Sequence, residues 1–268
     1  MQLIDTHTHL YLPEFETDRD EIVKRAVSSG VVKLLLPNID CQSIDTMLSA
    51  EARYPGICFP MSGLHPTSVK EDYQNQLDTL ESLFLKHKFI AIGEIGIDLY
   101  WDKSFLKEQL IAFRRQISFA IEKGLPVVVH SRESFPEVFS VLDEFEGSSL
   151  KGVFHAFTGS IKDAEKAITK GFKLGIGGIV TFKNSGLDVV IKETGVENLI
   201  LETDSPYLAP VPHRGKRNES SYICIINKKL AEIFGMSEEE VASVTFDNSV
   251  GLFNLRRKWK ILKRKYPY

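Results

Sequence analysis

Six side chains of metal-ligand type recur at the ends of short apolar runs: His7, His9, Glu94, His130, His155 and Asp204. Four imidazoles and two carboxylates are more than one ion needs. They would satisfy two ions about 3.5 to 4 Å apart that share one carboxylate. Such a pair lowers the pKa of a bridging water, which yields hydroxide at neutral pH, and it polarises the bond under attack. The set therefore predicts a hydrolytic metal centre.

The pair His7 and His9 is weak support by itself, because an isolated pair of this kind is more often a core or surface histidine pair than a metal site. Two residues that are two apart on a strand do point the same way, so both could face one ion. The placement of the other histidines strengthens the case. Six of the seven, namely 7, 9, 65, 130, 155 and 213, fall at or just beyond a predicted strand, and only His87 falls on a predicted helix.

Eight apolar runs of strand length begin near residues 3, 31, 56, 89, 125, 152, 172 and 198. Apolar runs without alternation are typical of parallel strands that are covered on both faces. Helical spacing between and after them predicts helices at 19–29, 43–53, 77–87, 106–123, 136–145, 222–234 and 237–253. This alternation predicts an α/β fold, a single-domain (β/α)8 TIM barrel over residues 1–255, since a doubly wound sheet usually stops at five or six strands. In such a barrel the ligands would meet at the carboxyl ends of the strands.

Composition and charge exclude several classes of protein. The 268 residues are 43% hydrophobic and 26% charged, as in a globular chain, and no apolar run approaches the length of a membrane span. Seven basic residues and no acidic one lie in a basic C-terminal tail, 256–268, so the remainder is acidic and lacks a broad surface for gripping nucleic acid. The tail could touch phosphates or anionic lipid, but a solvated segment is the simpler interpretation.

The three cysteines, Cys41, Cys58 and Cys224, have no metal-ligand spacing, and the chain starts without a secretory leader. These features favour a reducing, cytoplasmic location.

Six motifs in order resemble the TatD-type deoxyribonucleases, a branch of the amidohydrolase-like metal-dependent hydrolases. They are AspThrHisThrHisLeu from 5, GlyLeuHisPro from 63, GlyGluIleGlyIleAsp from 93, HisSerArg from 130, PheHisAlaPheThrGlySer from 154 and GluThrAspSerPro from 202. The resemblance runs from residue 3 to about 255 and leaves out the tail. One loop departs from the family, with ArgAsnGluSer at 217–220 in place of ArgAsnGluPro. The loss of proline predicts a more mobile loop.

The resemblance implies a role for each ligand. His7, His9, Glu94 and Asp204 would hold one ion and Glu94, His130 and His155 the other, with Glu94 as the bridge and Asp204 as the general base. His65 would lie close to the metals or the substrate.

The substrate side rests on two arginines near the barrel mouth. Arg132 and Arg214 are placed to reach a phosphate, although each could instead form a salt bridge to a neighbouring loop. Tyr100 and Trp101 could stack on a nucleobase or simply pack a loop.

The leading hypothesis is a metal-dependent hydrolase of phosphodiester bonds in DNA, an exonuclease on single-stranded ends that uses a metal-activated hydroxide. The alternative is a hydrolase of another ester, such as a D-aminoacyl-tRNA, because the same hydroxide attacks carbonyl and phosphoryl centres. A silent barrel that binds a partner through its tail is a third possibility, which the complete ligand set argues against. No obligate protein partner is evident.

Metal identity is left open between two arguments. Imidazole-rich coordination favours zinc, manganese or another transition ion. The resemblance implies magnesium. Two divalent ions per subunit are expected, with Mg2+ as the working cofactor and Mn2+ or Zn2+ as alternatives.

Overall fold

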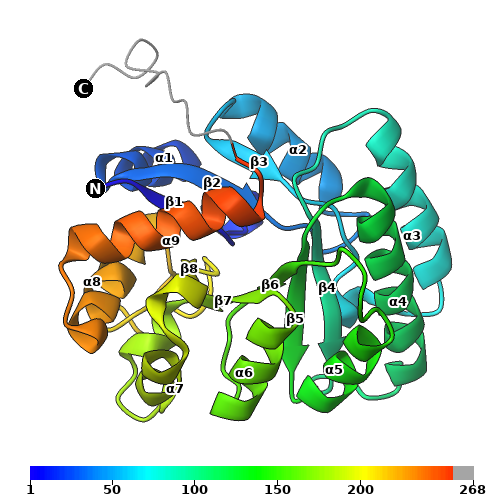
Figure 1. The fold of residues 1–268 in the computed structure, drawn as a ribbon. Coiled ribbons are helices and arrows are strands. Elements are labelled where there is room, and N and C mark those ends of the chain that lie inside the picture. The colour runs from blue at the N-terminus through cyan, green and yellow to red at the C-terminus, as the bar shows by residue number, and fades with distance from the viewer. Residues whose placement is uncertain (256–268) are drawn as a thin grey trace.

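A computed structural model describes residues 1–255; the predicted basic tail at 256–268 lies outside the described residues. Eight strands follow one another in the order expected (Figure 1). They are β1 (Leu3–Asp5), β2 (Val31–Leu36), β3 (Cys58–Pro60), β4 (Ile92–Asp98), β5 (Val127–Arg132), β6 (Gly152–Phe154), β7 (Phe172–Ile176) and β8 (Leu199–Leu201). Each pairs in parallel with the next within a sheet of three strands and a sheet of five.

The two sheets meet at both edges, so the strands form a barrel. An isolated parallel bridge between Ser62 and Ile92 joins the β3 side to β4, and another between Thr8 and Ser205 joins the chain after β1 to the chain after β8. Backbone hydrogen bonds accompany both bridges. The protein has the predicted TIM-barrel fold.

Helices surround the strands, and α9 lies beside β1 and β8 (Figure 1). The helices are α1 (Arg19–Ser28), α2 (Ile44–Arg53), α3 (Tyr73–Ser82), α4 (Leu106–Lys123), α5 (Phe135–Asp143), α6 (Ile161–Thr169), α7 (Leu187–Thr194), α8 (Ile223–Phe234) and α9 (Glu238–Leu252). Among residues 1–255, no helix combines the length and the apolar composition needed to cross a bilayer.

Two predicted elements are displaced along the chain. The apolar run at 89–92 precedes most of its strand, because β4 continues through Glu94 to Asp98 and is fully buried. Glu94 therefore lies inside β4 rather than at its end. The helix predicted at 77–87 starts earlier, at Tyr73, and gives way to a 3-10 turn at Leu83–Leu85. Polar residues fill much of the first turns of α3, which hides its beginning from a search for apolar spacing.

Side chains fill the barrel interior. Strands β1, β2, β5, β6 and β8, and residues beside β3 and β4, contribute Ile4, Leu35, Met61, Ala91, Val128, Val153 and Ile200. The last turn of α9 and the residues after it join this cluster through Val250, Leu252, Phe253 and Leu255. The barrel is thus a packed core, and polar chemistry is left to its carboxyl end.

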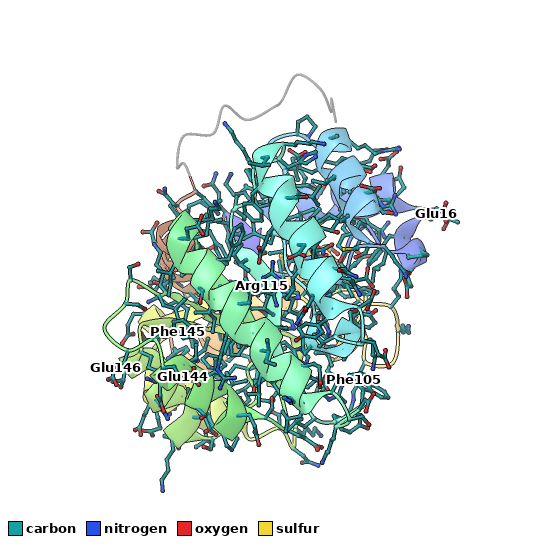
Figure 2. All side chains as sticks on the ribbon, turned by 90° about the vertical axis from the view of Figure 1, so that its right-hand side faces the viewer. Glu16, Phe105, Arg115, Glu144, Phe145 and Glu146 are labelled. Atoms are coloured by element: carbon teal, nitrogen blue, oxygen red, sulfur yellow. The ribbon has the colours of Figure 1, made fainter. Side chains whose placement is uncertain are left out.

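Ion pairs connect the outer helices. Arg115 of α4, which Figure 2 shows on the outer face of the barrel, lies 2.8 Å from Glu81 of α3. The neighbouring Arg114 lies 2.6 Å from Glu144, just beyond α5. Exposed pairs of this kind contribute little stability. Most of the stability must come from the buried apolar contacts.

We expect Phe154→Ala to lower the free energy of unfolding by about 3 to 5 kcal/mol. Phe154 is buried, and its ring lies 5.4 Å from those of Phe139 and Phe172, so truncation leaves a cavity among them. Phe154→Leu should cost less because it fills part of the space. Urea unfolding in the presence of chelator measures both variants without a contribution from bound metal. Equal stability of wild type and Phe154→Ala would contradict this account of the core.

Candidate metal centre

Glu94 lies at the centre of the histidine cluster, and its two oxygens face different imidazoles. Its Oε2 lies 3.0 Å from Nε2 of His7 and 3.8 Å from Nε2 of His9. Its Oε1 lies 2.8 Å from Nδ1 of His130 and 3.3 Å from Nε2 of His65. One buried carboxylate therefore connects two pairs of histidines, which is the geometry required of a bridging ligand.

Asp204 closes the cluster from the loop that follows β8. Its Oδ1 lies 3.5 Å from Nε2 of His9, 3.8 Å from Nε2 of His7 and 3.9 Å from Nε2 of His155. The His155 ring stacks on that of His7 at a centroid distance of 3.5 Å. All six side chains predicted from the sequence are thus brought together, although Glu94 and His130 lie on β4 and β5 and the other four lie on the loops after β1, β6 and β8.

The grouping of these side chains adds a residue to the expected set. Donor atoms converge in three overlapping groups: His7, His9 and Glu94; His7, His155 and Asp204; and His65, Glu94 and His130. His65 thus lies as close to Glu94 as the proposed ligands do. His155 lies nearer to His7 and is 3.7 Å from Glu94. The assignment of particular histidines to particular ions stays a prediction.

The residues fit divalent metal ions. His7 is completely buried, its Nδ1 has no hydrogen-bond partner, and its Nε2 contacts Oε2 of Glu94 at 3.0 Å without hydrogen-bond geometry. A buried polar atom without a partner is costly, and a metal ion would satisfy it. The donors are imidazole nitrogens and carboxylate oxygens, which suit zinc, manganese and related ions as well as harder cations.

The electrostatics keep the two carboxylates ionised. Burial raises the pKa of Glu94, but His155, His65 and His7 outweigh it and hold that pKa well below its usual value. Burial also raises the pKa of Asp204, and the neighbouring histidines again lower it overall. Burial lowers the pKa of His7 and of His65. Burial also lowers the pKa of His155 and of His130, but the neighbouring carboxylates outweigh it, so that the pKa of His155 rises to about 10 and that of His130 also rises. Because ionised carboxylates and neutral imidazoles are the forms that bind metal, a bound ion would have to displace the protons of these two histidines.

A second layer of carboxylates contacts the imidazoles from outside. Oδ2 of Asp98 lies 2.9 Å from Nε2 of His130, and Oε1 of Glu202 lies 2.9 Å from Nδ1 of His155. Carboxylates in this position fix the orientation of a ligand histidine. Both residues stand within the sequence motifs, but their types and spacing predicted no role for either. The sequence feature that could have identified them is a carboxylate within a few residues of a proposed ligand near a strand end.

The loop after β8 is held by buried polar groups. Asp5 accepts hydrogen bonds from the backbone N and the Oγ1 of Thr203 at 2.9 and 2.6 Å. The side chain of Asn218 donates to the carbonyls of Thr203 and Tyr207. Glu219, next to Asn218, accepts two hydrogen bonds from Arg25. The 217–220 loop is therefore anchored at several points in spite of its missing proline.

The two arginines expected at the substrate side do not join the cluster. The Arg132 guanidinium lies 3.8 Å from the ring centroid of Tyr100, and that of Arg214 lies 4.4 Å from the ring centroid of Phe182. Each is a cation–π contact rather than the salt bridge that was the alternative to phosphate binding. His213 stacks on Tyr222 at 4.1 Å and so lies outside the metal groups.

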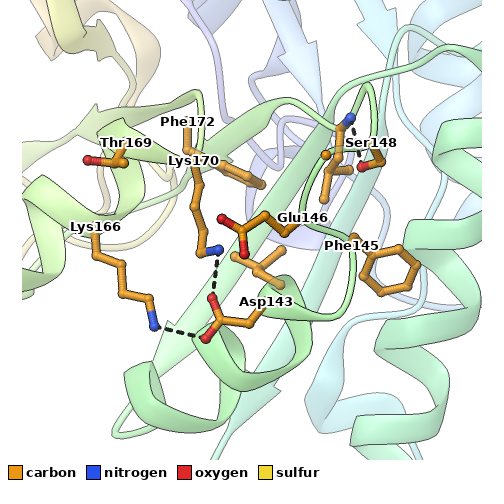
Figure 3. A pocket seen from close by; sticks show the side chains of 11 residues that line it. Asp143, Phe145, Glu146, Ser148, Lys166, Thr169, Lys170 and Phe172 are labelled. Atoms are coloured by element: carbon orange, nitrogen blue, oxygen red, sulfur yellow. Dashed lines mark hydrogen bonds and ion pairs between the residues drawn. The ribbon is translucent and has the colours of Figure 1, made fainter.

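A pocket of about 670 Å3 lies away from this centre (Figure 3). It is lined by the end of α5, the end of α6 and the chain leading into β6 and β7, all at the amino ends of the strands. In Figure 3, Lys166 and Lys170 converge on Asp143 at 3.1 and 2.6 Å. The histidines meet at the opposite end of the barrel, so this pocket does not belong to the metal centre.

The barrel and its buried cluster of histidines and carboxylates are those of a metal-dependent hydrolase. The chain belongs to the TatD-related DNase family, whose model matches residues 4–254.

Relatives and solved structures agree with this. The metal-dependent hydrolase YabD of Bacillus subtilis is 36% identical over 94% of this chain and 99% of its own length. The 3'-5' ssDNA/RNA exonuclease TatD of Pantoea vagans is 32% identical over 94% of this chain and all of its own. The structure of YjjV, a TatD homologue from Escherichia coli K12, superposes with a TM-score of 0.87 at 29% identity and covers 95% of this chain and 98% of that one.

We expect Glu202→Gln to weaken metal binding about 10- to 100-fold, because the charge that orients His155 is lost. Calorimetric titration of metal-free protein with Mn2+ or Zn2+ measures the change. Gly175→Ala should have a similar effect, since a Cβ there would lie 2.2 Å from Oε2 of Glu202 and displace it. Gly251→Ala in α9 is the matched control, because its Cβ would meet open space. Unchanged affinity in Glu202→Gln would mean that Glu202 does not orient the ligand.

Proposed function

We propose that this metal-dependent hydrolase cleaves phosphodiester bonds of DNA and removes nucleotides from single-stranded ends. The observation that carries the proposal is Glu94, whose two oxygens each face a separate pair of histidines. That arrangement suits two ions on one bridging carboxylate. The Pantoea vagans relative named as an ssDNA/RNA exonuclease supports the choice of substrate.

When bound, two divalent ions would lower the pKa of a water molecule and polarise the phosphoryl oxygens. His7, His9, His130, His155, Glu94 and Asp204 would hold them, and His65 lies close enough to take part. We retain Mg2+ as the expected ion in function, with Mn2+ or Zn2+ as alternatives, since the donor set admits all three.

Asp204 has the properties of a general base. The histidines keep its carboxylate ionised, and its Oδ1 points into the ligand cluster, where it can accept a proton from an attacking water. The water oxygen forms a bond to phosphorus while the bond to the leaving nucleoside oxygen breaks. The proton held at Asp204 then returns to that leaving oxygen. Glu94 holds the histidines on either side of it in position throughout the reaction.

We also propose a reducing, cytoplasmic setting, supported by three cysteines that lie unpaired at positions 41, 58 and 224. The division into a catalytic barrel, 1–255, and a basic tail, 256–268, is likewise a proposal. The family model, which ends at residue 254, supports it.

Asp204→Asn should lower kcat on a labelled single-stranded oligonucleotide by about 10^2- to 10^4-fold, the usual contribution of a general base. Removal of metal with a chelator should abolish cleavage, and restoring Mg2+, Mn2+ or Zn2+ separately should identify the ion that supports it. Asp143→Asn is the control, since Asp143 is a carboxylate in a surface ion pair at the other end of the barrel.

The same preparations should be offered a charged D-aminoacyl-tRNA. Cleavage of that ester alone, abolished by Glu94→Ala, would contradict the nuclease proposal and establish the alternative. Equal loss of activity in Asp143→Asn would show that the effect of Asp204→Asn is not specific to the centre.

A further inference from the structure

Exposed apolar side chains gather at the mouth of the barrel. Among the described residues, five of the nine large hydrophobic side chains that are well exposed lie on the loops after β4 and β8: Tyr100, Trp101, Tyr207, Leu208 and Val211. Both loops begin next to carboxylates of the metal centre. An apolar surface beside a reactive site is typical of a ligand-binding surface.

The aromatic turn at residues 100–101 is joined to the centre by a single side chain. Oδ1 of Asp98 accepts hydrogen bonds from the backbone N of Tyr100 at 3.0 Å and of Trp101 at 3.1 Å. Oδ2 of the same carboxylate lies 2.9 Å from Nε2 of His130. The position of the two aromatic rings is therefore fixed relative to a histidine of the cluster.

A cation covers one ring of this turn. The guanidinium of Arg132, at the end of β5, lies 3.8 Å from the Tyr100 centroid and 5.3 Å from that of Trp101. The two rings meet edge to face at 4.9 Å. Trp101 nevertheless remains 68% exposed. The turn thus presents an indole ring to solvent with a positive charge beside it.

From this arrangement, which rests on the proposed function, we propose that Tyr100, Trp101 and Arg132 form a stacking subsite for one unpaired nucleobase of the strand under cleavage. An indole face stacks on any base, and Arg132 supplies charge to the adjoining phosphate. In a duplex the faces of the bases are already covered by their neighbours. The subsite would therefore select single strands, which the metal centre alone does not do.

The test measures binding rather than turnover. Metal-free protein is titrated with fluorescein-labelled single-stranded oligonucleotides of one length, either intact or carrying one abasic nucleotide at successive positions. Trp101→Ala should weaken binding of the intact strand about 5- to 100-fold, corresponding to one lost stacking contact. Trp101→Phe should retain most of the affinity. Leu85→Ala, which removes an exposed apolar side chain on the outer surface, is the matched control and should change nothing.

The abasic series separates stacking from loop packing. In the wild type, one abasic position should reduce affinity by about the same factor as Trp101→Ala, and in that variant the same position should carry no further penalty. An equal loss for intact and abasic strands in Trp101→Ala would overturn the subsite, because it would indicate a disturbed loop.

Intrinsic fluorescence gives a second readout. The only other tryptophan in the sequence is Trp259, so a Trp259→Phe background reports Trp101 alone. Binding of the intact strand should quench its emission, and absence of quenching or of any binding overturns the subsite. If the strand binds with this pattern but no metal supports its cleavage, the proposed activity fails and the subsite stands. If wild type and Trp101→Ala bind and cleave the strand equally well, the proposed activity stands and the subsite fails.

Discussion

The burial of Glu94 among histidines is the constraint on which the rest of the site depends. A carboxylate taken out of water is strongly disfavoured unless positive charge or hydrogen bonds replace its solvation. Here the histidines more than offset the effect of burial on the pKa of Glu94. These histidines come from segments as far apart in the chain as β1 and β6, so only a barrel that brings its strand ends together can make the carboxylate tolerable. The proposed metal-binding side chains therefore come together only when the barrel folds.

From Glu94 outward, each layer of the structure orients the one inside it. Asp98 and Glu202 contact imidazoles of the cluster, and they are themselves positioned by the backbone and by close packing. Oε1 of Gln109, on α4, accepts a hydrogen bond from the backbone N of Asp98 at 2.9 Å. Gly175 leaves the space that the carboxylate of Glu202 occupies. Glu94 and His130 lie within strands, and the other proposed ligands follow the end of a strand by no more than four residues, which favours accurate ligand geometry.

Much of this could be predicted from the sequence, because parallel strands deliver their last residues to one edge. The eight strands follow from the apolar runs, and the six proposed ligands follow from the polar residues at the ends of those runs. It could not place Glu94 inside β4, since strand limits depend on pairing with neighbours rather than on local apolar runs. Nor could it place His65 against Glu94, or Glu202 against His155. Those contacts depend on how side chains from different strands meet across the barrel, which the spacing of residues along one strand does not determine.

Several residues other than glycine near the carboxyl end of the barrel have a left-handed backbone conformation. Asp204 adopts a left-handed φ of 56°, and Ala156 and Leu208 have similarly positive values. Such conformations cost of order 1 kcal/mol or more for residues other than glycine, so they persist only where surrounding bonds enforce them. The N–H of Asp204 donates to the carbonyl of His7 at 2.9 Å, and its own carbonyl accepts from Tyr207 at 2.8 Å. These hydrogen bonds direct the carboxylate of Asp204 into the cluster. The left-handed backbone lowers the local stability, and the packing of the barrel beneath it offsets that cost.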